Sequence, residues 1–262
     1  MTSQAKTVLI TGASGGIGLA FAELFARDGW HLVTAARSAD KLEASAADFR
    51  KRFGVTVLPI ALDLAQAGAA QALYERVARA GVHVDALVNN AGFATYGFFR
   101  DIPLEDERQE MQLNMLTLTE LSKLCLEPML ARGTGRILNV ASNGAFQPCP
   151  GMAVYCATKA YVLSFSEALS NELAGTGVTV TALCPGATES GFQERAKLHD
   201  SPAVQRKLPD AMSAARAGYE AMLAGKRLVI PGAGTKIGAF LPRLLPRGVV
   251  LSVARRMLAP RR

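Results

Sequence analysis

The chain has 262 residues, of which half are hydrophobic and 19% are charged. This balance excludes a disordered chain and supports a large buried core, because disordered segments combine low hydrophobicity with high net charge. The length is typical of one α/β domain with a large sheet, so we expect a single domain over residues 1–262.

The net charge of +7 is concentrated at one end of the chain. Residues 226–262 contain nine of the 29 lysines and arginines and no acidic residue, which leaves 20 basic against 22 acidic side chains in residues 1–225. We expect no nucleic acid partner, because the body has neither a basic stripe nor a recognition motif. No apolar run approaches the roughly 18 residues of a spanning helix, so we expect a protein that is soluble or at most peripheral at a membrane.

Cysteines and histidines predict neither a disulfide framework nor a metal site. The cysteines show no paired spacing and no Cys-x-x-Cys element, and the first residues contain no apolar leader, so we expect a reduced, cytoplasmic compartment. The histidines are far apart in sequence and form no metal motif. These residues are Cys125, Cys149, Cys156, Cys184, His31, His83 and His199.

Residues 7–28 have the pattern of a strand, a glycine turn and a helix. Thr7–Ile10 is short and apolar, the turn reads TGASGGIG over residues 11–18, and an amphipathic stretch follows. Glycines permit a tight turn and let the backbone approach a pyrophosphate, whose charge is met by N–H groups at the helix start. The spacing is Gly-x-x-x-Gly-x-Gly, which departs from the common dinucleotide fingerprint.

The second predicted strand, residues 31–36, ends at Arg37 and carries no carboxylate. An acidic residue near this position suits the ribose of NAD, whereas an arginine suits a 2′-phosphate. We therefore predict NADP(H) as the cofactor. The alternative is that Arg37 is a solvated loop residue.

The remaining chain alternates strands with helices. This order builds right-handed crossovers, and it predicts a Rossmann-like, doubly wound parallel sheet of about seven strands with helices on both faces. The predicted helices are 39–53, 66–80, 106–132 and 152–174, and the predicted strands are 55–62, 86–88, 136–141, 178–183 and 228–230.

Tyr155 and Lys159 are the residues at which a reaction could take place. Four residues apart on a helix, they share one face, and a positive neighbour favours ionisation of a phenol whose ordinary pKa is about 10. Tyr155 would then exchange a proton near neutral pH. Ser142 follows a predicted strand and could meet the same substrate oxygen. A surface tyrosine beside a helical lysine is the alternative interpretation of the pair alone.

Over residues 7 to about 230 the chain resembles the short-chain dehydrogenase/reductases. The resemblance rests on TGxxxGIG at 11–18, NNAG at 89–92, Asn114, Ser142, Tyr155-x-x-x-Lys159 and Pro185-Gly186, which occur in the order and spacing of that family. It implies that Tyr155 donates a proton to a carbonyl oxygen, or accepts one in the oxidative direction. It further implies that Lys159 binds the nicotinamide ribose and keeps the phenol acidic.

The resemblance also implies that Ser142 stabilises the reacting oxygen and that Asn114 distorts its helix and holds a water linked to Lys159. Other residues are implied to contact the cofactor. They are Gly12, Ser14, Gly16, Ile17 and Gly18 at the pyrophosphate and ribose, Arg37 at the 2′-phosphate, Asp63 and Leu64 at the adenine, Asn90, Ala91 and Gly92 on the adenosine side, and Pro185, Gly186, Thr188 and Ser190 at the nicotinamide.

Two segments near the C-terminus remain, and the resemblance thins in the second of them. Residues 189–215 lack a clear period and are a candidate substrate lid. Residues 236–262 form a basic tail in which 249–258 could make a short amphipathic helix. The tail either packs on the body, binds anionic lipid, or docks a phosphate-bearing or acyl substrate.

We therefore expect one dinucleotide-binding and catalytic domain that interconverts a carbonyl and a secondary alcohol with NADP(H) and without metal. The alternative is an NADP(H)-binding scaffold with little turnover, recruited to a membrane or partner by the tail. Family members commonly form dimers or tetramers through the two long helices, and we expect the same. The predicted pocket wall is mainly apolar and consists of Ala94, Phe98, Phe146, Met152, Phe192 and Met212.

Overall fold

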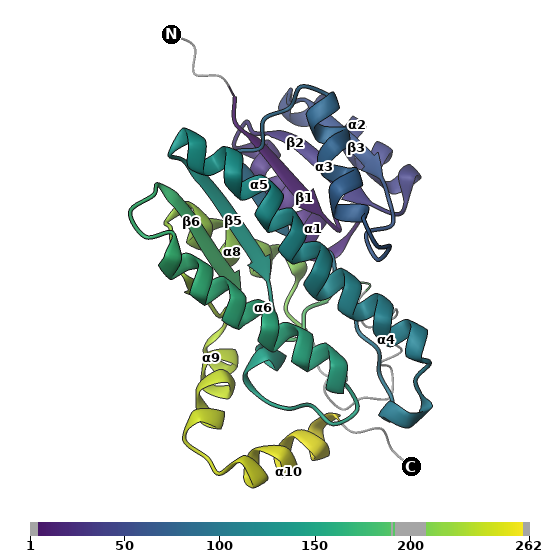
Figure 1. Ribbon diagram of the computed structural model, residues 1–262, viewed down its shortest axis with the longest axis vertical. Helices are drawn as coiled ribbons and strands as arrows, with labels where there is room; N and C mark the ends of the chain where they lie inside the picture. The colour runs from purple at the N-terminus through teal and green to yellow at the C-terminus, as the bar shows by residue number, and fades with distance from the viewer. Residues whose placement is uncertain (1–4, 190, 192–207, 259–262) are drawn as a thin grey trace.

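The computed structural model describes residues 5–189, 191 and 208–258. Its centre is a seven-stranded sheet in the order β3-β2-β1-β4-β5-β6-β7, and every neighbouring pair is parallel (Figure 1). The predicted sheet is thereby confirmed. The strands are β1 Thr7–Thr11, β2 His31–Ala36, β3 Val57–Ala61, β4 Ala86–Asn89, β5 Gly135–Val140, β6 Val178–Leu183 and β7 Leu228–Val229.

Helices cover both faces of this sheet. One face carries α1 Gly16–Arg27, α2 Ala39–Phe53 and α8 Ala211–Leu223, and the other carries α3 Ala69–Arg79, α5 Leu118–Arg132 and α6 Ala153–Glu172. A shorter helix, α4 Leu104–Met111, precedes α5. Two further helices, α9 Ala233–Phe240 and α10 Arg247–Leu258, extend below the carboxyl ends of the strands in Figure 1.

The sheet is apolar on both faces, as the continuous hydrophobic runs of its strands require. All five residues of β1 are buried. On one face Phe25 of α1 makes edge contacts with Trp30 and Tyr219, with ring centres 5.1 Å and 4.8 Å away. On the other face Leu121 and Met129 of α5 are almost fully buried. The two cores fix the sheet between its helical layers.

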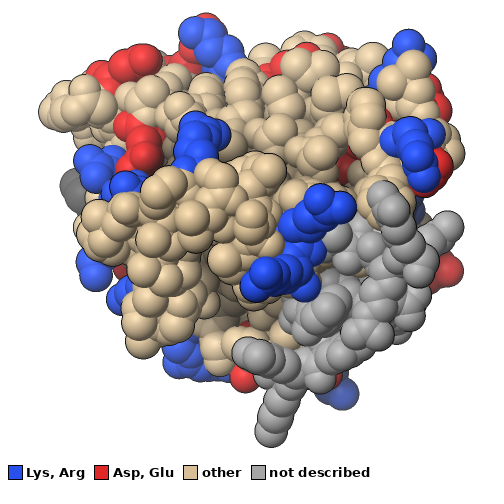
Figure 2. Space-filling view, turned by 90° about the horizontal axis from the view of Figure 1, so that it is seen from below, with Lys and Arg blue, Asp and Glu red and all other residues tan. Residues whose placement is uncertain are grey.

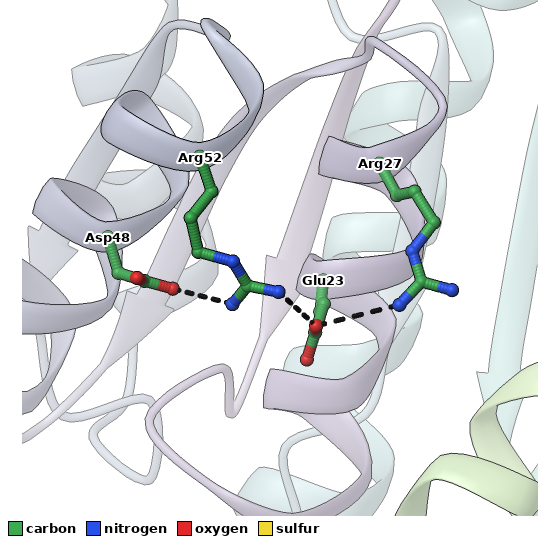
Figure 3. A network of polar contacts seen from close by, with 4 residues as sticks. All are labelled: Glu23, Arg27, Asp48 and Arg52. Atoms are coloured by element: carbon green, nitrogen blue, oxygen red, sulfur yellow. Dashed lines mark hydrogen bonds and ion pairs between the residues drawn. The ribbon is translucent and has the colours of Figure 1, made fainter.

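Figure 3 shows a polar network that connects α1 to α2 on the surface. Arg52 donates to Asp48 at 2.8 Å and to Glu23 at 2.7 Å, and Arg27 lies 3.6 Å from the same glutamate. Exposed ion pairs contribute little to folding stability. The network orients two helices that the buried core already holds together.

The predicted helix 106–132 is interrupted. Residues 112–117 form a π-helical turn between α4 and α5. Such turns insert one extra residue and often mark functional sites. Here the turn carries Asn114, whose buried side chain bonds to the backbone of Phe93 instead of facing solvent.

The last residues of the candidate lid 189–215 form the start of α8. Asp210 caps α8 by accepting a hydrogen bond from the Ser213 backbone at 2.6 Å, and α8 then packs against α1. Within residues 211–215, Ala214 and Ala215 are buried and Ala211 and Met212 pack partly buried against the core, whereas Ser213 is exposed. The central part of the segment, residues 192–207, lies outside the described residues.

Candidate active site

A cavity of about 550 Å³ lies at the carboxyl ends of β1, β4, β5 and β6. The strand order reverses between β1 and β4, and ligands of open α/β sheets bind at such a switch point. Of the predicted site residues that the structure describes, the cavity is lined by all except Gly18 and Asn114. The lining includes Gly12, Ser14, Gly16, Ile17, Arg37, Asp63, Leu64, Asn90, Ala91, Gly92, Ser142, Tyr155, Lys159, Pro185, Gly186 and Thr188. Ser190 lies outside the described residues.

The glycine turn after β1 leaves the start of α1 open to the cavity. Gly12 has a φ of 69°, and a Cβ on Gly18 would lie only 2.3 Å from the Gly12 carbonyl oxygen, so neither position accepts a side chain. The N-cap Gly15 supplies no side-chain acceptor, and the first turn of α1 holds no acidic residue. The N–H groups at this helix end suit the pyrophosphate of a dinucleotide.

Asn90 holds the glycine turn in place from the neighbouring strand. Its Nδ2 donates to the carbonyl oxygens of Thr11 at 2.9 Å and Gly12 at 3.3 Å. Thr11 in turn accepts, through Oγ1, from the backbone N–H groups of Asn90 and Ala91, both at 3.0 Å. The side chain of Asn90 therefore supports the shape of the site in addition to lining it.

Two cations lie at the opposite end of the cofactor cleft. Arg37 and Lys41 both line the cavity, together with Ser38. Sequence reasoning missed Lys41, although its position one turn after Arg37 was a usable signal. Asp63 also lines the cleft, and its carboxylate accepts from Ala65 N at 3.1 Å and Gln66 Nε2 at 3.2 Å. The basic pair fits a 2′-phosphate.

Ser142 and Tyr155 meet at the inner end of the cavity. Ser142 follows β5 in extended conformation, and its Oγ accepts a hydrogen bond from Gly144 N at 3.1 Å. The same side chain hydrogen-bonds with the Tyr155 phenol. Because α6 begins at Ala153, Tyr155 lies in its first turn. The predicted convergence of the two hydroxyl groups is present.

The expected acidic phenol is not present in the protein alone. Burial raises the pKa of Tyr155 to about 12, an effect that the Ser142 hydrogen bond only partly offsets. Burial also lowers the pKa of Lys159 to about 8. Its ammonium donates to Val140 O at 2.8 Å and lies 5.7 Å from the centre of the Tyr155 ring. The sequence argument counted the attraction of the positive charge and omitted the larger cost of desolvation.

Asn114 lies beside this group. Its Nδ2 donates to Phe93 O at 2.9 Å and to Thr158 Oγ1 at 3.1 Å, and its Oδ1 accepts from Phe93 N at 3.2 Å. A Cβ on Gly92 would come within 3.0 Å of Asn114 Oδ1 and 3.4 Å of Lys159 Nζ. Because Gly92 has no side chain, the side chains of Asn114 and Lys159 can both lie close to its Cα.

Glu110 is a charged neighbour that the sequence analysis missed. It lies one turn before Asn114 and is fully buried, and its Oε2 accepts from Thr95 N and Thr95 Oγ1, both at 2.8 Å. The other oxygen, Oε1, has no hydrogen-bond partner among the described residues. Burial raises the pKa of this carboxyl to about 7, with the charge of Lys159 acting in the opposite direction.

The substrate end of the cavity differs from the predicted wall. Met152 lines it as expected, but Ala94 packs behind the lining, Phe146 joins the core beside α6, and Met212 packs near α1. Phe98 does not line the cavity, and Phe192 lies outside the described residues. The wall is formed instead by Gln147, Cys149, Cys156, Met257 and Leu258.

Cys149 and Cys156 are joined by a disulfide bond, which corrects the expectation of four unpaired cysteines. The bond links the loop before α6 to its first turn, next to Tyr155. Sequence spacing gave no signal, because one cysteine is in a loop and the other is in a helix. Cys125 and Cys184 are free and buried. No group of residues suited to a metal ion occurs in the described part of the chain.

Residues 6–200 match the short chain dehydrogenase family. The chain belongs to this family. It is 34% identical over 185 residues to the ketoacyl reductase HetN of Nostoc sp., which covers 71% of this chain and 64% of that protein. It is 34% identical over 202 residues to a putative ketoacyl reductase of Streptomyces coelicolor, covering 76% of this chain and 77% of the relative. The chain thus spans slightly less than two thirds of the Nostoc protein.

Solved structures share the architecture over nearly the whole chain. A short-chain dehydrogenase from Sphingobium yanoikuyae in complex with NADPH superimposes with a TM-score of 0.82 at 33% identity, covering 93% of this chain and 94% of that one. The bulky-bulky ketone specific alcohol dehydrogenase from Comamonas testosteroni gives 0.78 at 30% identity, covering 92% and 93%. The similarity extends past residue 200, where the family match ends.

Proposed function

We propose that the protein is an NADP(H)-dependent oxidoreductase that interconverts a carbonyl and a secondary alcohol on a mainly apolar substrate. The observation that carries this proposal is the convergence of Ser142, Tyr155 and Lys159 at the inner end of one cavity, whose outer end offers an open helix terminus and two cations. Family membership and an NADPH-bound structural neighbour support it.

The residues present fit a bound NADP(H). The N–H groups at the start of α1 would hold the pyrophosphate, and Arg37 with Lys41 would bind the 2′-phosphate. Asp63 and Leu64 would lie at the adenine, and Pro185 to Thr188 would lie at the nicotinamide end. When bound, the cofactor supplies a hydride to the carbonyl carbon or accepts one from the alcohol.

Tyr155 would deliver the proton to the carbonyl oxygen. With a pKa near 12 the phenol is protonated over the whole working range of pH, so it is a competent acid in the reductive direction. Ser142 would donate a hydrogen bond to the same oxygen and stabilise its developing charge. In the protein alone the Ser142 hydroxyl donates to the phenol. With substrate bound it would donate to the carbonyl oxygen instead.

Lys159 would stabilise the phenolate that Tyr155 leaves behind. Its ammonium is fixed by the Val140 carbonyl close to the phenol ring, and a positive charge there lowers the cost of losing the phenolic proton. Asn114 would position the Phe93 backbone and the Thr158 side chain, to both of which it donates hydrogen bonds. With the pKa of Lys159 near 8, the reductive rate is expected to fall as the pH rises through this value.

The lining at the substrate end suits an apolar ketone or alcohol. It consists of Met152, Met257, Leu258 and the sulfur atoms of a disulfide, with Gln147 as the polar member. The names of a ketoacyl reductase and a putative ketoacyl reductase among the relatives, and of a bulky-bulky ketone specific alcohol dehydrogenase among the structures, support a carbonyl substrate.

The experiment is a panel of apolar ketones of increasing size, followed by NADPH consumption. Wild-type protein should oxidise NADPH with at least one of them, and Tyr155→Phe should reduce kcat by about three orders of magnitude while NADPH binding is retained. Equal rates for the two proteins would contradict the assigned proton donor. The scaffold alternative requires NADPH binding without turnover in the wild type, and it gives no reason to bury a lysine and a tyrosine together.

We also propose a homodimer or homotetramer built on α4–α5 and α6. These helices expose Met111, Leu116 and Tyr161 to solvent in a single chain. Analytical ultracentrifugation should give a mass above 27.7 kDa that Leu116→Lys reduces. A monomer at micromolar concentration would refute this assembly.

A further inference from the structure

The segment formed by α9 and α10 has two different faces. Toward the body, Ala239, Val250 and Ala254 are buried, and Leu258 packs on the cluster of Ala94, Cys149, Met152 and Cys156. Met257 and Leu258 also line the cavity. The inner face of this segment therefore forms part of the entrance to the substrate end.

The outer face exposes large apolar side chains. Nine of the sixteen large hydrophobic residues that are exposed in the described part of the chain lie in these two helices and their connection, so the apolar surface is concentrated there. Leu244 is 67% exposed, Ile237 60% and Phe240 55%. Exposed apolar groups at this density mark an interaction surface.

The same segment is purely cationic. Lys236, Arg243, Arg247, Arg255 and Arg256 lie in it, no acidic residue occurs after Lys226, and none of the five forms a salt bridge with a described residue. Figure 2, which views the molecule from the side of α9 and α10, shows lysines and arginines standing on a broad uncharged surface, with acidic side chains mostly toward the edges. Cations around exposed apolar residues are the signature of a helix that lies in a membrane interface.

We propose that residues 236–257 seat this protein on an anionic lipid bilayer, so that an apolar substrate enters the cavity from the lipid past Met257 and Leu258. Burial of Leu244, Phe240 and their neighbours among acyl chains removes their exposed surface from water. The arginines then lie at the level of the phosphate groups. The docking itself is independent of the proposed function, whereas the route of the substrate rests on it.

A second copy of this chain is a poorer occupant of the same surface. In a two-fold dimer the patch would face itself, which would bring five uncompensated cations of one chain against the same five of the other. Like charges brought together in this way oppose association. An anionic bilayer removes the repulsion and offers an apolar interior at the same time.

The test compares the full-length protein on phosphatidylcholine vesicles with and without phosphatidylserine, measured by sedimentation. Wild type should bind the anionic vesicles and remain in solution with the neutral ones. The triple variant Arg243→Gln, Arg247→Gln, Arg255→Gln should bind anionic vesicles about fivefold more weakly for each arginine removed. The variant Phe240→Ser, Leu244→Ser should also lose binding, because the apolar anchors are gone.

The matched control is Arg79→Gln, Arg100→Gln, Arg108→Gln, which removes the same charge from exposed positions of the body. It should bind like the wild type. Equal losses in both triple variants, or wild type that stays in solution with anionic vesicles, would overturn the proposal. Concentration-dependent self-association that the Phe240 and Leu244 variant abolishes, without vesicle binding, would overturn it in favour of a second copy.

Activity assays separate this proposal from the proposed function. With a short water-miscible ketone, the arginine variant should match the wild type. With a long-chain ketone dissolved in anionic vesicles, its rate should fall in parallel with binding. Vesicle binding without turnover of either ketone would refute the proposed function and leave docking supported, whereas turnover without vesicle binding would refute docking alone.

Discussion

The two ends of the cavity are built in different ways. The cofactor end is formed by backbone at strand ends, by the start of α1 and by residues that are close together in sequence, such as Arg37 and Lys41. The substrate end is formed by side chains from a loop, from the first turn of α6 and from α10, which is nearly 100 residues further along the chain. Each part of the cofactor end is thus a short motif that local sequence specifies, whereas only the tertiary structure specifies the substrate end.

Glu110 lies outside the cavity lining, but its charge acts on Lys159. Substituting Glu110 therefore shows whether the site depends on a charge from outside the two ends of the cavity. Its pKa is raised in the folded protein to about 7, so the folded state holds this proton more tightly than the unfolded state does. The stabilising contribution of the protonated Glu110 is therefore complete below about pH 4.5, the ordinary pKa of a glutamate. It is lost as the pH rises through the folded-state pKa of about 7. A shift of this size corresponds to about 3 kcal/mol in the free energy of unfolding.

Glu110→Gln should therefore match the wild type near pH 4.5 and exceed its stability by up to about 3 kcal/mol at pH 8. Denaturant unfolding at several pH values measures the difference. Without the negative charge, the pKa of Lys159 should fall further, and the alkaline limb of the reductive rate should move to lower pH. Glu75→Gln on the exposed face of α3 is the control. A stability difference that is constant with pH would contradict the buried, titrating carboxyl.

Arg37 tests the cofactor end alone. Arg37→Asp would replace the proposed charge-assisted contact to the 2′-phosphate by repulsion, and it would offer a carboxylate to a ribose hydroxyl. The ratio of kcat/KM for NADPH to that for NADH should fall about 100-fold, consistent with a loss of roughly 2 to 3 kcal/mol for a hydrogen bond to a charged group. The KM for the ketone should not change. An unchanged cofactor ratio would leave Arg37 as a solvated loop residue.

Lys41→Gln in the same assay should give a smaller shift, because Arg37 remains. Arg79→Asp, at an exposed position of α3, is the control for a change in net charge. If Lys41→Gln alone abolished the preference for NADPH, the lysine that sequence reasoning missed would be the main 2′-phosphate contact.

The sequence predicted the parts of the site that follow from chain-local rules. The sheet, the glycine turn, Arg37 and the Tyr155–Lys159 pair depend on periodicity and spacing, and the structure places all of them as expected. Glu110 gave no signal, because a glutamate in a helical pattern is normally solvent-exposed. The disulfide and the position of Leu258 could not be predicted from the sequence either. Contacts between a loop, a helix and a distant C-terminal segment leave no periodic pattern in the sequence.

The prediction that Tyr155 has a lowered pKa is wrong for a related reason. Spacing on a helix predicts which residues are neighbours, but it does not predict how deeply they are buried, and burial dominates here. A family resemblance supplied the candidate residues and their roles as hypotheses. It could not supply the electrostatic environment, which depends on Glu110, Val140 and the packing around them.

The disulfide tests the substrate end alone. Reduction, or Cys149→Ser, Cys156→Ser, opens a bond between residues seven apart in sequence. Closing a loop of this length restricts the unfolded chain, so its loss should lower the free energy of unfolding by about 2 kcal/mol. The loop before α6 should also become less constrained beside Tyr155, and the KM for a bulky ketone should rise several-fold.

Cofactor binding provides the internal control, because the bond joins the loop before α6 to the first turn of α6, whereas the pyrophosphate is expected at the start of α1. Fluorescence titration should give the same Kd for NADPH in the oxidised, reduced and serine forms. Cys125→Ser is the control for removing a buried thiol that is not in the bond. If reduction weakened NADPH binding as much as ketone binding, the two ends would be one coupled unit. Independent responses would instead mean that changes in the loop and in α10 can alter the substrate specificity without altering the cofactor specificity, which depends on the glycine turn and Arg37.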